Sequence, residues 1–82
     1  MNRVEFTFDG TSHYALYEIS HLDGTSEYYL ELRDRTLITE FGLGISFKRS
    51  PEGSLLLDET ATTRKKDLLE TILLSIDRAA VK

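Results

Sequence analysis

Apolar and polar side chains alternate regularly at the start of the chain. Val4, Phe6 and Phe8 share one parity, and the residues between them are polar. This alternation predicts a strand with one buried and one solvated face. Two segments of similar sequence, 9–16 and 23–30, follow, and each begins with Asp-Gly-Thr-Ser. Because Asp and Gly both tolerate a positive φ angle, each segment predicts a hairpin turn.

Parity also restricts the length of these hairpin loops. Only an even loop, either Asp-Gly or Asp-Gly-Thr-Ser, keeps the apolar side chains of neighbouring strands on one face of the sheet. The four-residue version pairs Val4 with Tyr17 and Ile19 with Leu30. With an even loop, the predicted apolar face consists of Val4, Phe6, Phe8, Ala15, Tyr17, Ile19, Tyr28, Leu30 and Leu32.

The middle of the chain predicts further short strands. Residues 33–35 are expected to turn, and residues 36–41 are rich in β-forming side chains, which predicts a strand. Gly42-Leu43-Gly44 then predicts a bulge, bend or tight turn, so that residues 36–49 form either one bent strand or two. After the strand at 45–49, Ser50-Pro51-Glu52-Gly53 has the order of a tight turn, and residues 55–57 close the sheet.

The hydrophobic period changes to 3.6 residues from about Thr60, which predicts an amphipathic helix. Its apolar arc consists of Leu68, Leu69, Ile72, Leu73, Ile76, Ala79 and Ala80, with Leu74 and Val81 as apolar exceptions on the polar side. A helix of about 20 residues is long enough to cross a small sheet. The predicted fold is therefore α+β in one domain: an antiparallel β-meander of about five strands over residues 1–58, followed by one C-terminal helix over residues 60–81 packed on one face.

Composition narrows the chemistry that the chain can perform. The 82 residues include no cysteine, which excludes disulfides, zinc-thiolate sites and thiol nucleophiles. The start of the chain has no signal-peptide pattern, and its apolar runs are short, so we expect a soluble cytoplasmic protein. The formal net charge is −4, and residues 1–32 carry six acids against one base. This acidic N-terminal segment opposes binding to phosphate backbones.

The residues that invite a catalytic or metal-binding interpretation do not form a recognisable site. His13 and His21 lie eight residues apart on one predicted strand, about 26 Å at about 3.3 Å per residue. No serine stands in a Gly-x-Ser-x-Gly motif, and Gly42-Leu43-Gly44 lacks the further glycine and helix of a phosphate-binding loop. We therefore predict no enzyme activity, no catalytic residues, no metal and no cofactor.

The start of the predicted helix carries three consecutive bases, Arg64, Lys65 and Lys66. Bases are unusual in a first helical turn, and with the free amides they form a candidate anion-binding site. In the competing interpretation, which we favour, Asp58 and Glu59 cap the helix and offset the charge.

The second face of the predicted sheet is the strongest functional feature. Tyr14, Leu16 and Tyr29 fall on it among charged residues, and a single helix covers only one face of a sheet. Exposed tyrosines are good strand formers, but tyrosine with a charged rim is also typical of interfaces. The sequence therefore predicts a non-enzymatic protein-interaction module of the adaptor, inhibitor or immunity type. Its partner is a protein with a basic surface or a second copy of the chain, which would make a homodimer.

The alternative function is binding of single-stranded nucleic acid. The order of a meander followed by a helix resembles, in topology alone, modules of the transcription-coactivator and PUR-repeat types. The bases available for such binding lie in the C-terminal part of the chain: Arg33, Arg35, Lys48, Arg49, Arg64, Lys65 and Lys66. Clustering of these bases on one surface would favour nucleic-acid binding, and dispersal would oppose it.

Overall fold

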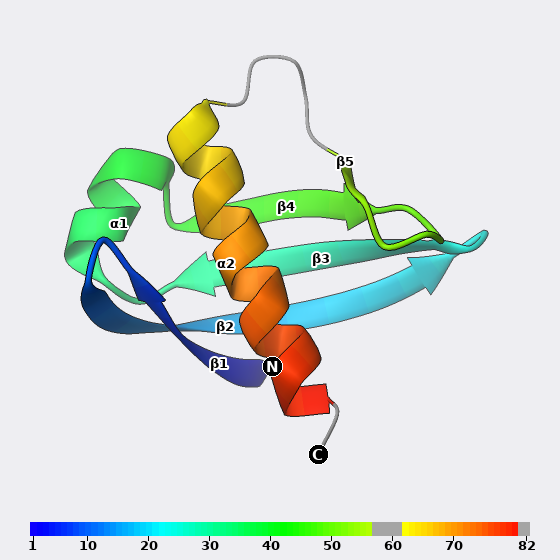
Figure 1. The fold of residues 1–82 in the computed structure, drawn as a ribbon, viewed down its shortest axis with the longest axis horizontal. Coiled ribbons are helices and arrows are strands. Elements are labelled where there is room, and N and C mark those ends of the chain that lie inside the picture. The colour runs from blue at the N-terminus through cyan, green and yellow to red at the C-terminus, as the bar shows by residue number, and fades with distance from the viewer. Residues whose placement is uncertain (57–61, 81–82) are drawn as a thin grey trace.

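Five antiparallel strands and two helices make up the fold in a computed structural model that describes residues 1–56 and 62–80 (Figure 1). The elements are β1 (Asn2–Phe8), β2 (Thr11–Leu22), β3 (Thr25–Leu32), α1 (Arg35–Phe41), β4 (Gly44–Arg49), β5 (Leu55–Leu56) and α2 (Thr63–Ala80). The strands lie side by side in the order of the sequence, β1-β2-β3-β4-β5. The predicted α+β meander with a C-terminal helix is confirmed.

Two-residue turns join the first three strands. Asp9 and Gly10 have φ angles of 53° and 76°, and Asp23 and Gly24 have φ angles of 51° and 78°. Two successive positive φ angles define type I′ turns, whose twist matches that of the flanking strands. Val4 therefore pairs with Ala15 and Tyr17 with Leu30. The pairs Val4–Tyr17 and Ile19–Leu30, predicted for a four-residue loop, are therefore wrong by two residues. The predicted assignment of side chains to the two faces is correct, because loops of two and four residues preserve the same parity.

Residues 36–41 form part of a helix, so the strand predicted there is wrong. Asp34 caps α1: its Oδ1 accepts hydrogen bonds from the amides of Thr36 (2.9 Å) and Leu37 (3.3 Å). At the other end, Gly42 has a φ angle of 96° and donates its N–H to the carbonyl of Ile38 at 2.8 Å. Caps at both ends outweigh the β-propensity of the residues between them, and Leu37 reaches the core.

Thr62 caps the C-terminal helix. Its Oγ1 accepts a hydrogen bond from the amide of Lys65 at 3.1 Å, and its carbonyl accepts one from the amide of Lys66 at 3.0 Å. The described helix begins at Thr63 rather than at about Thr60. The predicted caps Asp58 and Glu59, the last residue of the 55–57 strand and Val81 lie outside the described residues.

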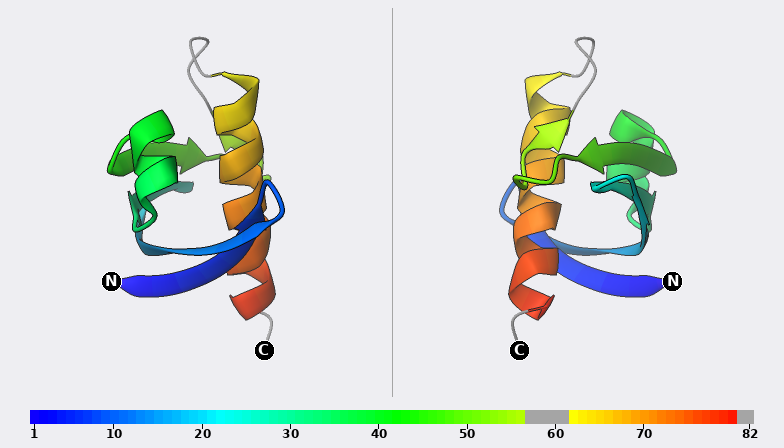
Figure 2. Two further views of the ribbon diagram at one scale, coloured as in Figure 1. Left: turned by 90° about the vertical axis from the view of Figure 1, so that its left-hand side faces the viewer. Right: turned by 90° about the vertical axis from the view of Figure 1, so that its right-hand side faces the viewer.

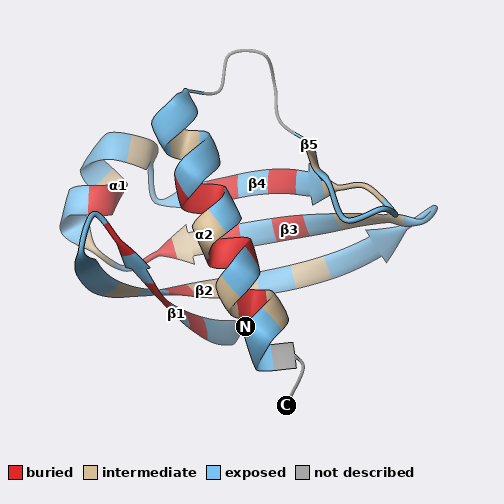
Figure 3. Cartoon of the chain, viewed as in Figure 1, coloured by how far each residue is buried: buried red, intermediate tan, exposed pale blue. Residues whose placement is uncertain are grey.

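The core lies between α2 and one face of the sheet. The sheet curls partly around the helix, which crosses it on the concave side (Figure 2). Along α2, buried and exposed residues alternate with the helical period (Figure 3). Its buried side chains are Leu68, Leu69, Ile72, Leu73 and Ile76. Ala79, predicted to belong to the apolar arc, is exposed.

Candidate interaction surface on the open face of the sheet

The sheet face turned away from α2, here called the open face, carries the three residues predicted to bind a partner. The register places on this face the odd residues of β1 and β3 and the even residues of β2 and β4. Tyr14 and Tyr29 are 38% and 41% exposed, and Leu16 is half-buried. Leu16 pairs with Glu31, so that Tyr29, two residues earlier on β3, is its diagonal neighbour. No helix among the described residues covers this face.

Arg3 packs on the ring of Tyr14. The guanidinium of Arg3 lies over the ring, 4.2 Å from its centroid, in a cation–π contact. The neighbouring Tyr14 hydroxyl, followed by the Glu31 carboxylate, raises the pKa of Arg33 above its ordinary value. The Arg33 Nη1 donates to Glu31 Oε1 at 2.7 Å. Arg3 therefore covers one side of the Tyr14 ring.

Tyr29 rests against a glycine of the neighbouring strand. A Cβ atom placed on Gly44 would lie only 2.8 Å from the Tyr29 hydroxyl oxygen and 3.1 Å from its Cε1. The tyrosine ring thus occupies the space that a side chain at position 44 would need. A half-exposed ring with a fixed resting place loses little entropy when a partner packs on it.

Acidic residues surround these aromatic rings. Glu18 pairs directly across from Tyr29, and no described base forms an ion pair with it. Glu5 pairs with Arg3 at 3.1 Å, and Glu27 lies opposite Lys48 in the register. The unpaired Glu18 carboxylate beside Tyr29 favours a partner with a basic group.

A shallow concavity of about 430 Å³ lies beside these residues on β1 and β2. Its walls include Arg3, Glu5, His13 and Tyr14. It is open, and most of the residues that line it are polar. A small-molecule site, in contrast, is mostly apolar and encloses its ligand.

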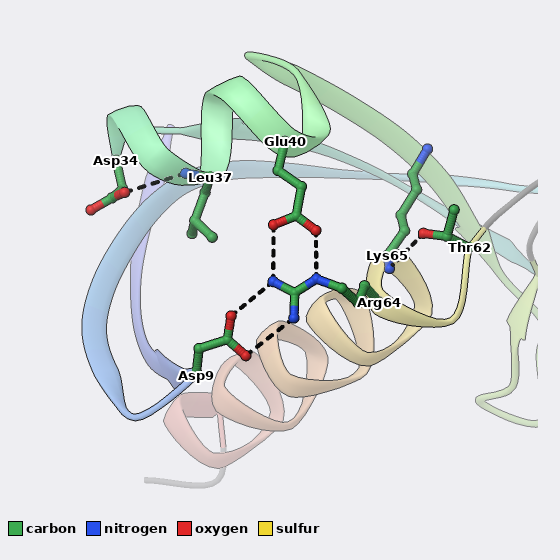
Figure 4. A network of polar contacts seen from close by, with 7 residues as sticks. All are labelled: Asp9, Asp34, Leu37, Glu40, Thr62, Arg64 and Lys65. Carbon is green, nitrogen blue, oxygen red and sulfur yellow. Dashed lines mark hydrogen bonds and ion pairs between the residues drawn. The ribbon is translucent and has the colours of Figure 1, made fainter.

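The three bases at the start of α2 do not act as one group. Arg64 bridges three elements: its Nη2 donates to Asp9 of the β1–β2 turn at 2.8 Å and to Glu40 of α1 at 2.9 Å (Figure 4). Its guanidinium also lies 5.3 Å from the centroid of the Phe8 ring. Lys65 is half-buried and Lys66 is exposed. Two carboxylates already occupy Arg64, so an anion at this place would have to compete with them.

These ion pairs perturb the titration of their members. Hydrogen bonds from Arg64 lower the pKa of Asp9 and of Glu40 below their ordinary values of 3.8 and 4.5. Hydrogen bonds to Glu40 and then to Asp9 raise the pKa of Arg64. The site is a structural clamp that ties the β1–β2 turn and α1 to α2.

A second arginine forms a similar link near the other end of α2. Arg49 donates from Nη1 and Nη2 to the two carboxylate oxygens of Asp77, at 3.0 and 2.8 Å. It also donates from Nη1 to the hydroxyl of Tyr28 at 3.3 Å and from Nε to the carbonyl of Gly53 at 3.0 Å. Hydrogen bonds from Arg49 lower the pKa of Asp77. Bidentate geometry makes this the best-formed ion pair between the sheet and α2.

The side chain of His13 is buried, which the sequence did not predict. Its side chain is 7% exposed, and its Nδ1 lies 3.1 Å from Oδ2 of Asp34, the cap of α1, without a well-aligned hydrogen bond. Partial burial raises the pKa of Asp34, but the amides of Leu37 and Thr36 and the contact with His13 outweigh it and lower that pKa overall. The pair links β2 to α1.

The other predicted histidine lies far from this pair. His21 is exposed, and its Nδ1 lies 3.1 Å from the hydroxyl oxygen of Ser26. Within residues 1–56 and 62–80, no three histidine, aspartate or glutamate side chains gather closely enough to hold a metal ion.

Comparison of the chain with protein families, curated proteins and solved structures finds no match. Neither described helix is long and apolar enough to span a membrane.

Proposed function

We propose that the protein is a non-enzymatic interaction module that binds a protein partner through Tyr14, Leu16 and Tyr29 of the open face. The observation that carries this proposal is the pair of positioned, half-exposed tyrosines on the face that no described helix covers. Tyrosine is enriched at interfaces because its rigid ring buries a large area at low entropic cost.

The charge of the open face indicates the charge of the proposed partner. Glu18 has no described cationic partner and stands across from Tyr29. A lysine or arginine of a partner placed over the rings would meet both this carboxylate and the faces of the tyrosines. We therefore propose a partner whose contact surface is basic.

The alternative, binding of single-stranded nucleic acid, has less support. Arg49 is held by Asp77, Arg64 by Asp9 and Glu40, and Arg33 by Glu31. Bases engaged with internal carboxylates gain little by neutralising phosphates. Titration of a labelled single-stranded oligonucleotide should show only weak binding that disappears with salt. Micromolar binding at moderate salt would reverse the ranking.

A position-specific photo-crosslinker tests the proposed function in cells that produce the protein. It replaces Leu16 on the open face in one variant and the exposed Asp67 of α2 in a matched control. We expect one covalent product from position 16, with a yield that falls as salt screens the charges, and none of that mass from position 67. No product at position 16, or the same product at both positions, would contradict the proposal.

A further inference from the structure

The outer edge of β1 is the second surface of the fold that invites a partner. β1 is an edge strand seven residues long, and no described strand pairs with its outer side. An edge strand presents unpaired backbone donors and acceptors to any strand that approaches it. Proteins commonly shorten or bend such edges, and the opposite edge strand, β5, has only two residues.

The hydrogen-bond alternation identifies which groups of β1 point outward. The amide of Leu32 donates to the carbonyl of Leu43 at 2.9 Å, so the even residues of β3 bond toward β4. Because antiparallel pairs alternate, the odd residues of β3 then bond to the even residues of β2. The odd residues of β2 bond to the even residues of β1. The backbone groups of Arg3, Glu5 and Thr7 are therefore left facing outward.

The charges along this edge are self-complementary. An antiparallel pairing of β1 with a second copy, centred on Val4, places Arg3 opposite Glu5 of the second copy and Glu5 opposite its Arg3. Shifting the centre of symmetry by one residue, to Glu5 or to Arg3, sets two like charges opposite each other. Opposite charges directly across a strand pair are favourable and like charges are unfavourable. All three registers keep the apolar faces aligned, and only the one centred on Val4 sets Arg3 opposite Glu5 in both strands. This pairing exchanges the Arg3–Glu5 contact within each chain, at 3.1 Å, for two such contacts between the chains.

The space beside β1 is also open to an added strand. A groove of about 400 Å³ separates its residues Glu5 and Thr7 from the exposed Leu74 and Arg78 of α2. The concavity with Arg3 and Tyr14 in its walls shares Glu5 and Thr7 with this groove. The side chains of an added strand would point alternately to its two faces, and a concavity lies along β1 for each of these sets of side chains.

We infer that two copies of the chain associate through antiparallel pairing of β1 with β1, which continues the sheet across a two-fold axis at Val4. This contact goes beyond the proposed function, because it uses the edge of the sheet and leaves Tyr14, Leu16 and Tyr29 of the open face available to a partner. It also places the two open faces next to each other, so that a basic partner meets two sets of tyrosines.

Charge reversal tests the pairing. The Arg3→Glu protein carries two glutamates on β1, and the Glu5→Arg protein carries two arginines. Each alone should dimerise at least about tenfold more weakly than the unaltered chain. An equimolar mixture should form a one-to-one heterodimer in light scattering and native mass spectrometry, because every cross-strand pair is then of opposite charge. Failure of the mixture to associate would overturn the inference.

A backbone variant tests the hydrogen bonds of the same contact, although it also removes the charge of Glu5. Proline at an edge position whose N–H faces outward spares the ladder to the neighbouring strand. Glu5→Pro should therefore fold but remain monomeric, whereas Tyr29→Glu should dimerise like the unaltered chain. If Tyr29→Glu abolishes dimerisation and Glu5→Pro does not, the copies meet through the open face and the β1 pairing is wrong.

Hydrogen exchange provides a measurement that needs no variant. Amide exchange of Arg3 and Glu5 should slow as protein concentration rises, whereas the amides of Val4 and Phe6, bonded to β2, should be protected at every concentration. We expect a weak dimer, with a dissociation constant on the order of 100 μM, because the contact is small. A chain that stays monomeric at about 1 mM would refute the pairing.

Discussion

The ring of Tyr29 packs over the backbone of Gly44 on the open face. A Cβ atom on Gly44 would approach the Tyr29 hydroxyl oxygen to 2.8 Å. Gly44 does not have a positive φ angle, so its backbone tolerates alanine. The glycine is therefore needed for the position of the tyrosine rather than for the path of the chain.

Gly44→Ala should displace the Tyr29 ring and leave the fold intact. The hydroxyl is the far end of a half-exposed side chain, so the ring moves at a cost of no more than about 1 kcal/mol. Chemical shifts of the Tyr29 ring should change, and the crosslinking yield at position 16 should fall. Unchanged ring shifts would show that Tyr29 does not rest on β4.

Ile72 tests the packing of α2 on the sheet. Its side chain is fully buried, and Ile72→Ala should lower the free energy of unfolding by about 2–4 kcal/mol by leaving a cavity. Leu74 is the matched control, since it lies on the same helix and is 57% exposed. Leu74→Ala should cost less than about 0.5 kcal/mol. Similar costs for both variants in chemical denaturation would contradict the orientation of α2.

Asp34 should be required for α1. Asp34→Ala removes the acceptor of the Thr36 and Leu37 amides and the carboxylate beside His13. Asp34→Asn keeps the capping oxygen, because asparagine caps as well as aspartate. We expect a lower melting temperature and faster amide exchange in residues 36–41 for the alanine variant, with most of the effect absent in the asparagine variant. Equal effects would mean that the charge beside His13 matters more than the cap.

Acid should weaken the Arg64 clamp. The pKa values of Asp9 and Glu40 are lower in the folded chain than their ordinary values of 3.8 and 4.5. A carboxylate with a depressed pKa stabilises the fold above its ordinary pKa, and that stability is lost as pH falls through the folded value. Stability should therefore decrease below about pH 5. Arg64→Gln should flatten this acid limb, and an unchanged limb would show that other carboxylates produce it.

The sequence contains enough local information to predict the sheet faces and α2. Alternating parity separates Val4, Phe6 and Phe8 from the open face, and the 3.6-residue period marks Ile72 and its neighbours. Both signals follow from which residues can be buried together. The sequence did not distinguish a two-residue hairpin loop from a four-residue one, because both loops keep the same side chains on the same face of the sheet.

The predicted strand over residues 36–41 failed for a local reason. Propensity favoured strand for Thr36, Ile38 and Thr39, whereas the ends of the segment favoured helix. Asp34 before the segment and Gly42 after it form a recognisable pair of helix caps. Weighing these caps above propensity would have predicted α1.

The ion pairs between distant parts of the chain could not be predicted. Arg64 binds Glu40, 24 positions earlier in the chain, and Asp9, 55 positions earlier. Arg49 and Asp77 are 28 positions apart. His13 and Asp34 meet only because α1 folds back beside β2. Such pairs depend on tertiary geometry, which periodicity and composition do not encode.

Tyr29→Glu, in a chain with the photo-crosslinker at Leu16, tests most directly whether the open face binds a partner. Tyr29 is 41% exposed, so the new carboxylate stays solvated, and the unfolding free energy should change by less than about 1 kcal/mol. The variant removes the ring on which the proposed partner packs and over which its cationic group lies, so the crosslinked product should disappear. Phe6→Glu, on the buried face, should unfold the domain and serves as the control for the assignment of faces. A folded Tyr29→Glu chain that no longer crosslinks is the result we predict, and a folded chain that crosslinks at an unchanged yield would contradict the open face as a binding surface.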